Sequence, residues 1–362
     1  MIMLKRLLSH DLPRSRWLAL LLILIVLGLA TAPFLFPGTK ALNVSAKILI
    51  FIVLVASFDL LLGYTGIVSF AHTMFFGIGA YGVAIASTRM GPGWAALAVG
   101  VLAALMVSLL LSLLIGAFSL RVKAIFFAMI TLAVASAFLT LASQLSEFTG
   151  GEDGLTFKVP EALQPGTEYL DEPWLGVSVD GRLLSYYLLF VVTVVLVLTM
   201  LRIVNSPFGR VLQAIRENDF RAEAIGYRTV VYRTLSSVLS ALFACLAGCM
   251  LAIWLRYNGP DTSLSFEIML DVLLIVVIGG MGTLYGAVIG SVLFVVAQNY
   301  LQDLLALGAG MLEGVPVLGQ LVSPDRWLLW LGILFVLSVY HFPSGVVGRL
   351  RALRLARKAR SR

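Results

Sequence analysis

Residues 17–36, WLALLLILIVLGLATAPFLF, form one uninterrupted apolar run. A helix needs about 20 predominantly apolar residues to cross the hydrocarbon core of a bilayer, and this run has that length. Four basic residues precede it: Lys5, Arg6, Arg14 and Arg16. The apolar core of a secretory signal peptide is shorter and ends at a small-residue cleavage site, so we expect a retained first membrane helix.

The composition of the whole chain agrees with this first run. Charged residues make up 12% of the 362 residues and apolar residues 60%, whereas soluble domains average about 25% charged residues. So few charged side chains cannot cover a water-exposed surface, which excludes a soluble globular protein. Disorder requires low hydrophobicity and is excluded as well. We therefore predict an all-α integral membrane protein, because the apolar runs are long and continuous and lack the alternation of a β-barrel.

Ten segments are apolar enough to be transmembrane helices. We expect them at residues 17–36, 43–63, 66–88, 94–119, 124–146, 183–204, 234–256, 267–282, 284–305 and 326–342. The third and the eighth are rich in glycine, so either could be broken or re-entrant. The predicted organisation is an N-terminal segment at 1–16, a transmembrane domain at 17–342 and a basic tail at 343–362.

The basic residues orient these spans. Nineteen of the 26 Lys and Arg residues fall on one side of the membrane, and an excess of Lys and Arg marks cytoplasmic loops. We therefore expect both termini in the cytoplasm, and we attribute the net charge of +7 to this topology rather than to a nucleic-acid partner. The loop at 147–182 has eight acidic and two basic residues. It is expected to be periplasmic, as a solvated linker or as a docking surface for a soluble partner.

The stretch GYTGIVSFAHTMFFGIGAY at residues 63–81 departs from a plain leucine-rich span. Its glycines allow close helix packing and local unwinding. A histidine inside a membrane is costly and usually faces the bundle interior or water. Ser69, His72 and Phe76 are therefore candidates for a translocation path. The alternative is tight helix packing, with His72 hydrogen-bonded to a neighbouring carbonyl group.

A second glycine-rich stretch, IGGMGTLYGAVIG, occupies residues 278–290. Residues 279–282 are expected to form a turn between two spans. Glycines at 282, 286 and 290 repeat at intervals of four, a spacing that brings helices close together. The residues that we assign to helix packing in the two stretches are Gly63, Gly66, Gly77, Gly79, Gly282, Gly286 and Gly290.

Three carboxylates fall within or near the spans. A charged side chain at the bilayer centre costs about 2.5–3.5 kcal/mol on insertion scales. Glu267 and Asp271 are four residues apart and so share one helix face, which we expect near the outer mouth of a path. Asp59 lies near the inner end of its span. A role in a translocation path and a purely structural role are both open for these groups.

The segment at 205–233 is expected in the cytoplasm and is far longer than a connection of about 2–8 residues. Ser206 can cap one short helix, and Asn218 or Asp219 can cap a second. Gly226 can end the second helix. Two capped amphipathic helices at this place favour a docking element, and the alternative is a helix pair that rests on the lipid surface.

The chain lacks the signatures of common catalytic sites. There is no GxxxxGK[ST] phosphate-binding loop, no HExxH pair and no GxSxG elbow. His10, His72 and His341 are scattered, and Cys245 and Cys249 lack the further ligands that zinc requires. We therefore expect no enzymatic activity, no metal site and no cofactor bound by this chain.

Four blocks of the sequence resemble the LivM-like permease subunits of branched-chain amino acid ABC importers. They are the 63–81 stretch, TGGEDGL at 149–155, SPFGRVLQAIR at 206–216, and the glycine run at 279–286. The resemblance covers nearly the whole chain. It implies a type II-like ABC importer permease architecture with about ten transmembrane helices.

The resemblance also implies partners. A second related permease would complete the translocation path, and a periplasmic substrate-binding protein would deliver the substrate. Two cytoplasmic ATPase subunits would carry ATP and Mg²⁺, and the chain would lie in a bacterial inner membrane. The residues implied for ATPase coupling are Phe208, Gly209, Arg210, Ala214, Arg216, Glu223, Ala224 and Gly226.

The function expected from the resemblance is ATP-driven import of branched-chain or related hydrophobic amino acids. Importers of urea, short amides or aromatic acids share this class and stay open. An ion-coupled secondary transporter, with Asp59 as its candidate carboxylate, and a membrane scaffold without a path are the alternatives from other classes. Transport without ATPase partners would favour the secondary transporter.

Overall fold

The structure is a computed structural model that describes residues 16–36, 38–119, 124–170, 177–311, 323–341 and 345–348. The predicted N-terminal segment at 1–16, apart from Arg16, lies outside these residues. So does the basic tail at 343–362, apart from 345–348, and so do Arg121 and Lys123, which contribute to the predicted charge asymmetry.

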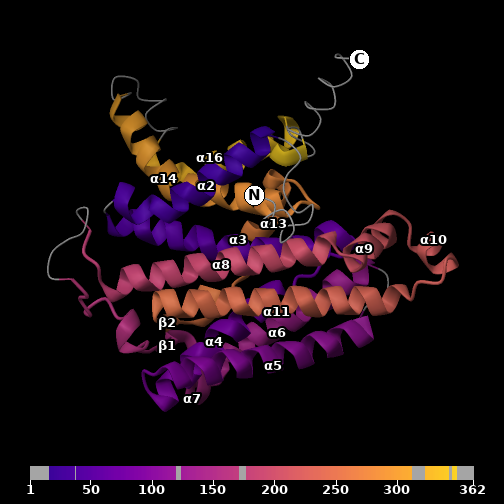
Figure 1. The fold of residues 1–362 in the computed structure, drawn as a ribbon, viewed down its shortest axis with the longest axis horizontal. Coiled ribbons are helices and arrows are strands. Elements are labelled where there is room, and N and C mark those ends of the chain that lie inside the picture. Colours follow the sequence, from indigo (N-terminus) through magenta and orange to yellow (C-terminus); the bar gives the residue numbers. More distant parts are fainter. Residues whose placement is uncertain are drawn as a thin grey trace, which may run out of the picture.

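Long helices dominate the described chain, and most of them run roughly along its longest axis (Figure 1). A helix coincides with each of the ten expected spans. These helices are α2 (Arg16–Leu35), α3 (Thr39–Thr65), α4 (His72–Met90), α5 (Trp94–Ser119), α6 (Ala124–Gln144), α8 (Gly181–Asn205), α11 (Thr229–Leu255), α13 (Phe266–Gly279), α14 (Leu284–Met311) and α16 (Trp327–His341).

Eight segments of the described chain are long and apolar enough to cross a membrane, and α16 is a shorter apolar helix. Helix α4 is not among the eight, since glycine, serine, threonine and histidine residues lower its hydropathy. The described strands are β1 (Leu155–Thr156) and β2 (Tyr257–Asn258), with two residues each. The predicted all-α membrane architecture is confirmed.

Helix α3 forms the centre of the bundle. Nearly all of its side chains from Val44 onward are buried, and it packs against α8, α11, α13 and α14. Helices α2, α5 and α6 instead expose large apolar side chains, including Leu24, Leu102 and Met129. Exposure of apolar surface to water costs about 25 cal/mol per Å², so these outer faces are suited to lipid.

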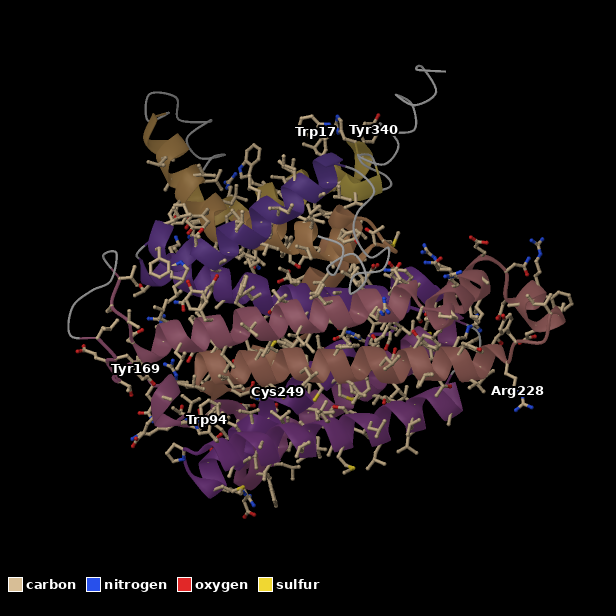
Figure 2. All side chains as sticks on the ribbon, in the orientation of Figure 1. Trp17, Trp94, Tyr169, Arg228, Cys249 and Tyr340 are labelled. Atoms are coloured by element: carbon tan, nitrogen blue, oxygen red, sulfur yellow. The ribbon has the colours of Figure 1, made fainter. Side chains whose placement is uncertain are left out.

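The two ends of the bundle differ in what connects the helices (Figure 1). We call the first the β1–β2 end, where α7 (Ser146–Thr149) and the two strands lie. We call the other the α9–α10 end, where α9 (Pro207–Glu217) and α10 (Asp219–Ala224) project beyond the long helices. Tyr169 lies at the first end and Arg228 at the second in Figure 2.

The expected helix at 66–88 is interrupted. Helix α3 ends at Thr65 because Gly66 adopts a left-handed conformation with φ of 74°, and α4 begins only at His72. The expected helix is therefore wrong over residues 66–71. His72 Nε2 lies 2.9 Å from Ser57 Oγ, so α4 starts beside the interior of α3 and not beside its end.

A second interruption precedes α13. After α11 the chain forms β2 and the single-turn helix α12 (Pro260–Ser263) before α13 starts at Phe266. The Phe266 ring centroid lies 6.1 Å from that of Phe70, and Leu264 fills the space beside Gly77. The two interruptions therefore meet inside the bundle. Non-helical backbone at membrane depth is tolerated only when protein or a water-filled cavity surrounds it.

The loop expected at 147–182 is folded where the structure describes it. Gly150, Gly151 and Gly154 of the TGGEDGL motif have φ values of 78°, 64° and 71°, conformations that favour glycine. Strand β1 follows the motif and pairs antiparallel with β2. The loop thereby ties α6 to the connection between α11 and α13.

Glycines allow the closest helix contact in the bundle, between α4 and α11. A Cβ atom added at Gly79 would collide with the carbonyl oxygen of Cys245, and one added at Gly248 would collide with that of Phe76. The Cys249 thiol lies 3.4 Å from the Gly79 carbonyl oxygen. Both cysteines are therefore packing residues of this interface.

Helices α13 and α14 form another close contact. A Cβ atom at Gly290 would lie 2.5 Å from the Ile275 carbonyl oxygen, and one at Gly286 would lie 2.8 Å from that of Gly279. Gly282 was assigned to this helix face from the sequence, but it does not lie on it. Its φ is 79°, and it lies in the turn before α14 begins at Leu284.

Candidate functional site

Helices α9 and α10 are built by local capping, as the sequence predicts. Ser206 Oγ accepts a hydrogen bond from the Gly209 amide at 3.4 Å, and Pro207 occupies the first turn of α9. Asn218 Oδ1 accepts from the Arg221 amide at 2.9 Å and so caps α10. Gly226 follows the end of α10 with φ of 96°. We call residues 206–228 the α9–α10 segment.

Packing fixes this segment against the long helices. Leu212 and Ile215 of α9 are buried, and the Phe208 ring stacks on Tyr232 of α11 with centroids 5.8 Å apart. A Cβ atom at Gly209 would collide with the Val204 carbonyl oxygen, so glycine is needed at the corner between α8 and α9.

Polar contacts hold α10 on the first turn of α11. The Asp219 carboxylate lies 3.0 Å from Arg233 Nη2, and Thr229 Oγ1 donates to Glu223 Oε1 at 2.6 Å. Glu223 is thus already bonded within this chain. Arg210, Ala214 and Ala224 are exposed.

Two large apolar side chains are exposed in and directly after α10, beyond the long helices. Phe220 is 83% exposed and Ile225 is 69% exposed. Phe220 belongs to α10 and Ile225 directly follows it, and α10 projects from the α9–α10 end of the bundle in Figure 1. Exposed aromatic and aliphatic side chains of this kind act as anchors when a partner covers them.

One cluster connects α9 to the transmembrane core. Arg216 Nη1 donates to the Gly63 carbonyl oxygen near the end of α3. One turn earlier on α3, Asp59 Oδ1 accepts from the Gly282 amide at 2.8 Å, and the Arg216 and Asp59 charges attract each other. These contacts therefore link α9 to α3 and to the α13–α14 turn. The sequence analysis assigned Arg216 to ATPase coupling through the resemblance, and that role stays a prediction.

The three path candidates near 63–81 lie in the protein interior. Ser69, His72 and Phe76 are all buried. Ser57 Oγ donates to the Leu54 carbonyl oxygen at 2.6 Å, so its single proton is used and His72 Nε2 must donate the 2.9 Å bond to it. The partner of His72 is a hydroxyl group and not the carbonyl group expected from the sequence. The assignment of these residues to a path stays a prediction.

Glu267 and Asp271, the other path candidates, lie on one face of α13. Glu267 is exposed and Asp271 is partly buried. Gln298 Nε2 of α14 donates to Asp271 Oδ2 at 3.4 Å, and Lys47 Nζ of α3 donates to Gln298 Oε1 at 2.9 Å. The sequence analysis missed Lys47 and Gln298. A lysine in an apolar span is the signal that could have revealed them.

Among the residues that the structure describes, no group of three or more His, Cys, Asp or Glu side chains is arranged to hold a metal ion. The expectation that this chain carries no metal or cofactor stays a prediction.

Comparison with known proteins adds independent information. The family model described as "Branched-chain amino acid transport system / permease component" matches residues 40–339. The high-affinity branched-chain amino acid transport system permease protein LivM of Salmonella typhimurium is 28% identical over 322 residues, which are 85% of this chain and 74% of that protein. LivM of Escherichia coli is 27% identical with the same coverage.

A relative that matches a smaller part of the chain is named for the import of a different substrate. The autoinducer 2 import system permease protein LsrC of Yersinia pseudotuberculosis is 30% identical over 168 residues, 42% of this chain and 48% of that protein. No solved structure matches the chain.

Proposed function

Because this chain belongs to the family of branched-chain amino acid transport permeases, we propose that it is a translocation subunit of an ATP-driven ABC importer. Its substrate is a branched-chain or related hydrophobic amino acid. The chain itself performs no ATP chemistry. ATP and Mg²⁺ bind to two ATPase subunits, a second related permease completes the path, and a periplasmic binding protein delivers the substrate.

The α9–α10 segment is the observation that carries this proposal. A permease without catalytic residues must convert a partner's conformational change into its own, which requires a docking surface joined rigidly to the spans. Phe220 and Ile225 offer exposed apolar anchors, while Arg216 joins the same segment to α3 through Gly63. ATP-driven closure of the ATPase subunits would thus move α3 and the α13–α14 turn together.

The proposed orientation places the α9–α10 end and both termini in the cytoplasm, and the β1–β2 end in the periplasm of a bacterial inner membrane. Six Arg residues between positions 202 and 233 support it, together with the acidic excess of 147–182. The folded loop at the β1–β2 end then faces the binding protein.

Reconstituted uptake tests the proposal. The chain is co-purified with the permease, ATPase and binding protein encoded beside it, and labelled leucine uptake into proteoliposomes is measured with and without ATP. We expect uptake that requires both ATP and the binding protein. Urea, acetamide and benzoate are the competing cargoes, and uptake of one of these in place of leucine contradicts the amino acid assignment. Leucine uptake without any ATPase subunit supports a secondary transporter.

A pair of variants tests the docking surface. Phe220→Asp places a charge on the exposed tip of α10 and should lower ATPase co-purification at least tenfold. Leu170→Asp makes the same change at a residue 53% exposed beside the β1–β2 end and should leave it unchanged. Full ATPase recovery with Phe220→Asp shows that the segment is only a connection at the lipid surface.

A further inference from the structure

Lys47, Asp271, Glu267 and Gln298 form a group of charged and polar side chains within the spans, which we call the mixed-charge cluster. Lys47 lies eight residues after the start of α3, about 12 Å along the helix at 1.5 Å per residue. Helix α13, which supplies both carboxylates, begins inside the bundle after the interrupted stretch at 256–265. All four residues therefore lie within candidate membrane spans.

The side chains of the cluster are not fully buried. Lys47, Gln298 and Asp271 are partly buried and Glu267 is exposed. Charged side chains on the lipid face of a span are expensive, so groups of this kind face a water-filled space or a partner. The exposed polar positions continue along α3 toward the β1–β2 end, where Asn43 accepts from Arg182 at 2.9 Å and Lys40 pairs with Asp303 at 2.5 Å. A polar face thus leads from that end to the cluster.

The hydrogen bonds of Gln298 define the chemistry that the cluster accepts. An ammonium group only donates and an ionised carboxylate only accepts, so the Gln298 amide must turn its oxygen to Lys47 and its nitrogen to Asp271. The amide therefore presents an acceptor and a donor side by side between a cation and an anion. The α-carboxylate and α-ammonium groups of an amino acid present the same pair, with one further atom between them.

We propose that the mixed-charge cluster binds the zwitterionic backbone of the amino acid in transit, with Gln298 as its placeholder. The substrate carboxylate takes the position of the Gln298 oxygen at Lys47. Its ammonium group takes the position of the Gln298 nitrogen at Asp271, and Glu267 adds negative charge one turn away. This inference rests on the proposed import function and predicts that the importer selects zwitterions over neutral amides or urea, which need no opposed charges.

The test uses the assembled importer and labelled leucine. Lys47→Met and Asp271→Asn should each lower the initial uptake rate at least tenfold, and the double variant Lys47→Met/Asp271→Asn should stay as low. If Lys47 and Asp271 are only structural partners of Gln298, the double variant should take up leucine better than either single variant. Removal of both charges then leaves no unpaired charged group. Restoration by the double variant therefore overturns the inference.

Gln298→Leu gives a second, independent readout. It removes the placeholder and leaves both charges, so uptake should continue with a KM changed by no more than about threefold. A purely structural role that needs Gln298 predicts loss of the assembled complex instead, and that result contradicts the inference.

A matched control lies outside this polar face, in the short helix η3 (Pro324–Arg326). Asp325→Asn/Arg326→Met removes one exposed carboxylate and one exposed cation and should leave uptake unchanged. The two proposals fail in different ways. If the wild-type importer moves no zwitterion, the proposed function fails, whereas normal leucine uptake by the Lys47 and Asp271 variants rejects the cluster alone.

Discussion

Arg216 illustrates how one side chain joins two layers of this protein. It lies on α9, a helix outside the spans, yet its guanidinium group bonds to the backbone of α3 and attracts Asp59. Asp59 in turn holds the Gly282 amide of the α13–α14 turn. Three elements far apart in sequence therefore share one small polar cluster.

Loss of the Arg216 contact should uncouple transport from ATP hydrolysis. A hydrogen bond to a charged group contributes about 1.5–3 kcal/mol, so Arg216→Gln should lower leucine uptake at least fivefold while the ATPase subunits still co-purify. Arg326→Gln removes an exposed arginine outside the α9–α10 segment and serves as the control. Equal uptake per ATP hydrolysed in both variants would show that Arg216 transmits no movement.

Gly79 shows a different constraint at the same scale, because backbone atoms of α11 occupy the space of its missing side chain. Gly79→Ala should destabilise the fold by about 1–3 kcal/mol, a usual cost of overpacking, and lower the thermal midpoint in detergent. Gly28→Ala is the matched control, since nothing lies within 4 Å of a Cβ atom there. An unchanged midpoint for Gly79→Ala would mean that the α4–α11 contact relaxes freely.

At the scale of elements, the two short strands join two connections that are far apart in the sequence. Strand β1 follows the TGGEDGL motif and β2 precedes α12, so their pairing joins the α6–α8 loop to the interrupted approach of α13. Tyr257 Oη also donates to the Asp153 carbonyl oxygen at 3.1 Å. The position where α13 starts inside the bundle is thereby fixed from the β1–β2 end.

Gly154→Ala should weaken this connection. Gly154 has φ of 71° and ψ of −170°, a region that side chains rarely adopt and that costs about 1–3 kcal/mol when forced. An added Cβ atom would also lie 2.5 Å from the Asn258 carbonyl oxygen. We expect faster limited proteolysis between 150 and 165. Gly166→Ala in the same loop has open space and should match the wild-type rate, and identical rates for both variants would contradict the argument.

In the whole molecule, the two ends of the helix bundle carry different connecting segments. One end carries the folded loop and the β1–β2 pairing, while the other carries the projecting α9–α10 segment (Figure 1). An importer requires this polarity, because the substrate arrives on one side of the membrane and the ATPase acts from the other.

Cysteine labelling tests the proposed orientation directly. Cys245 and Cys249 are buried, so they should add little background labelling. Glu161→Cys at the β1–β2 end should react with an impermeant maleimide in intact spheroplasts, whereas Gln213→Cys on α9 should react only after permeabilisation. Both positions are exposed. The reverse pattern would invert the topology and remove the ATPase from the α9–α10 end.

The sequence by itself determined the features that depend on neighbouring residues. Apolar runs of sufficient length predicted the spans, because lipid requires every backbone polar group to be bonded within its own segment. Ser206, Asn218 and Gly226 predicted the limits of α9 and α10, because caps act within a single helical turn.

Only the tertiary structure decided which distant residues meet. Arg216 was assigned to ATPase coupling from the resemblance, and the structure adds that it bonds to Gly63, 153 positions away. Lys47 reaches Gln298 across 251 positions, and His72 at the start of α4 meets Ser57 and Phe58 of α3. No local pattern encodes such pairs, since they arise when whole helices pack and every buried polar group must find a partner.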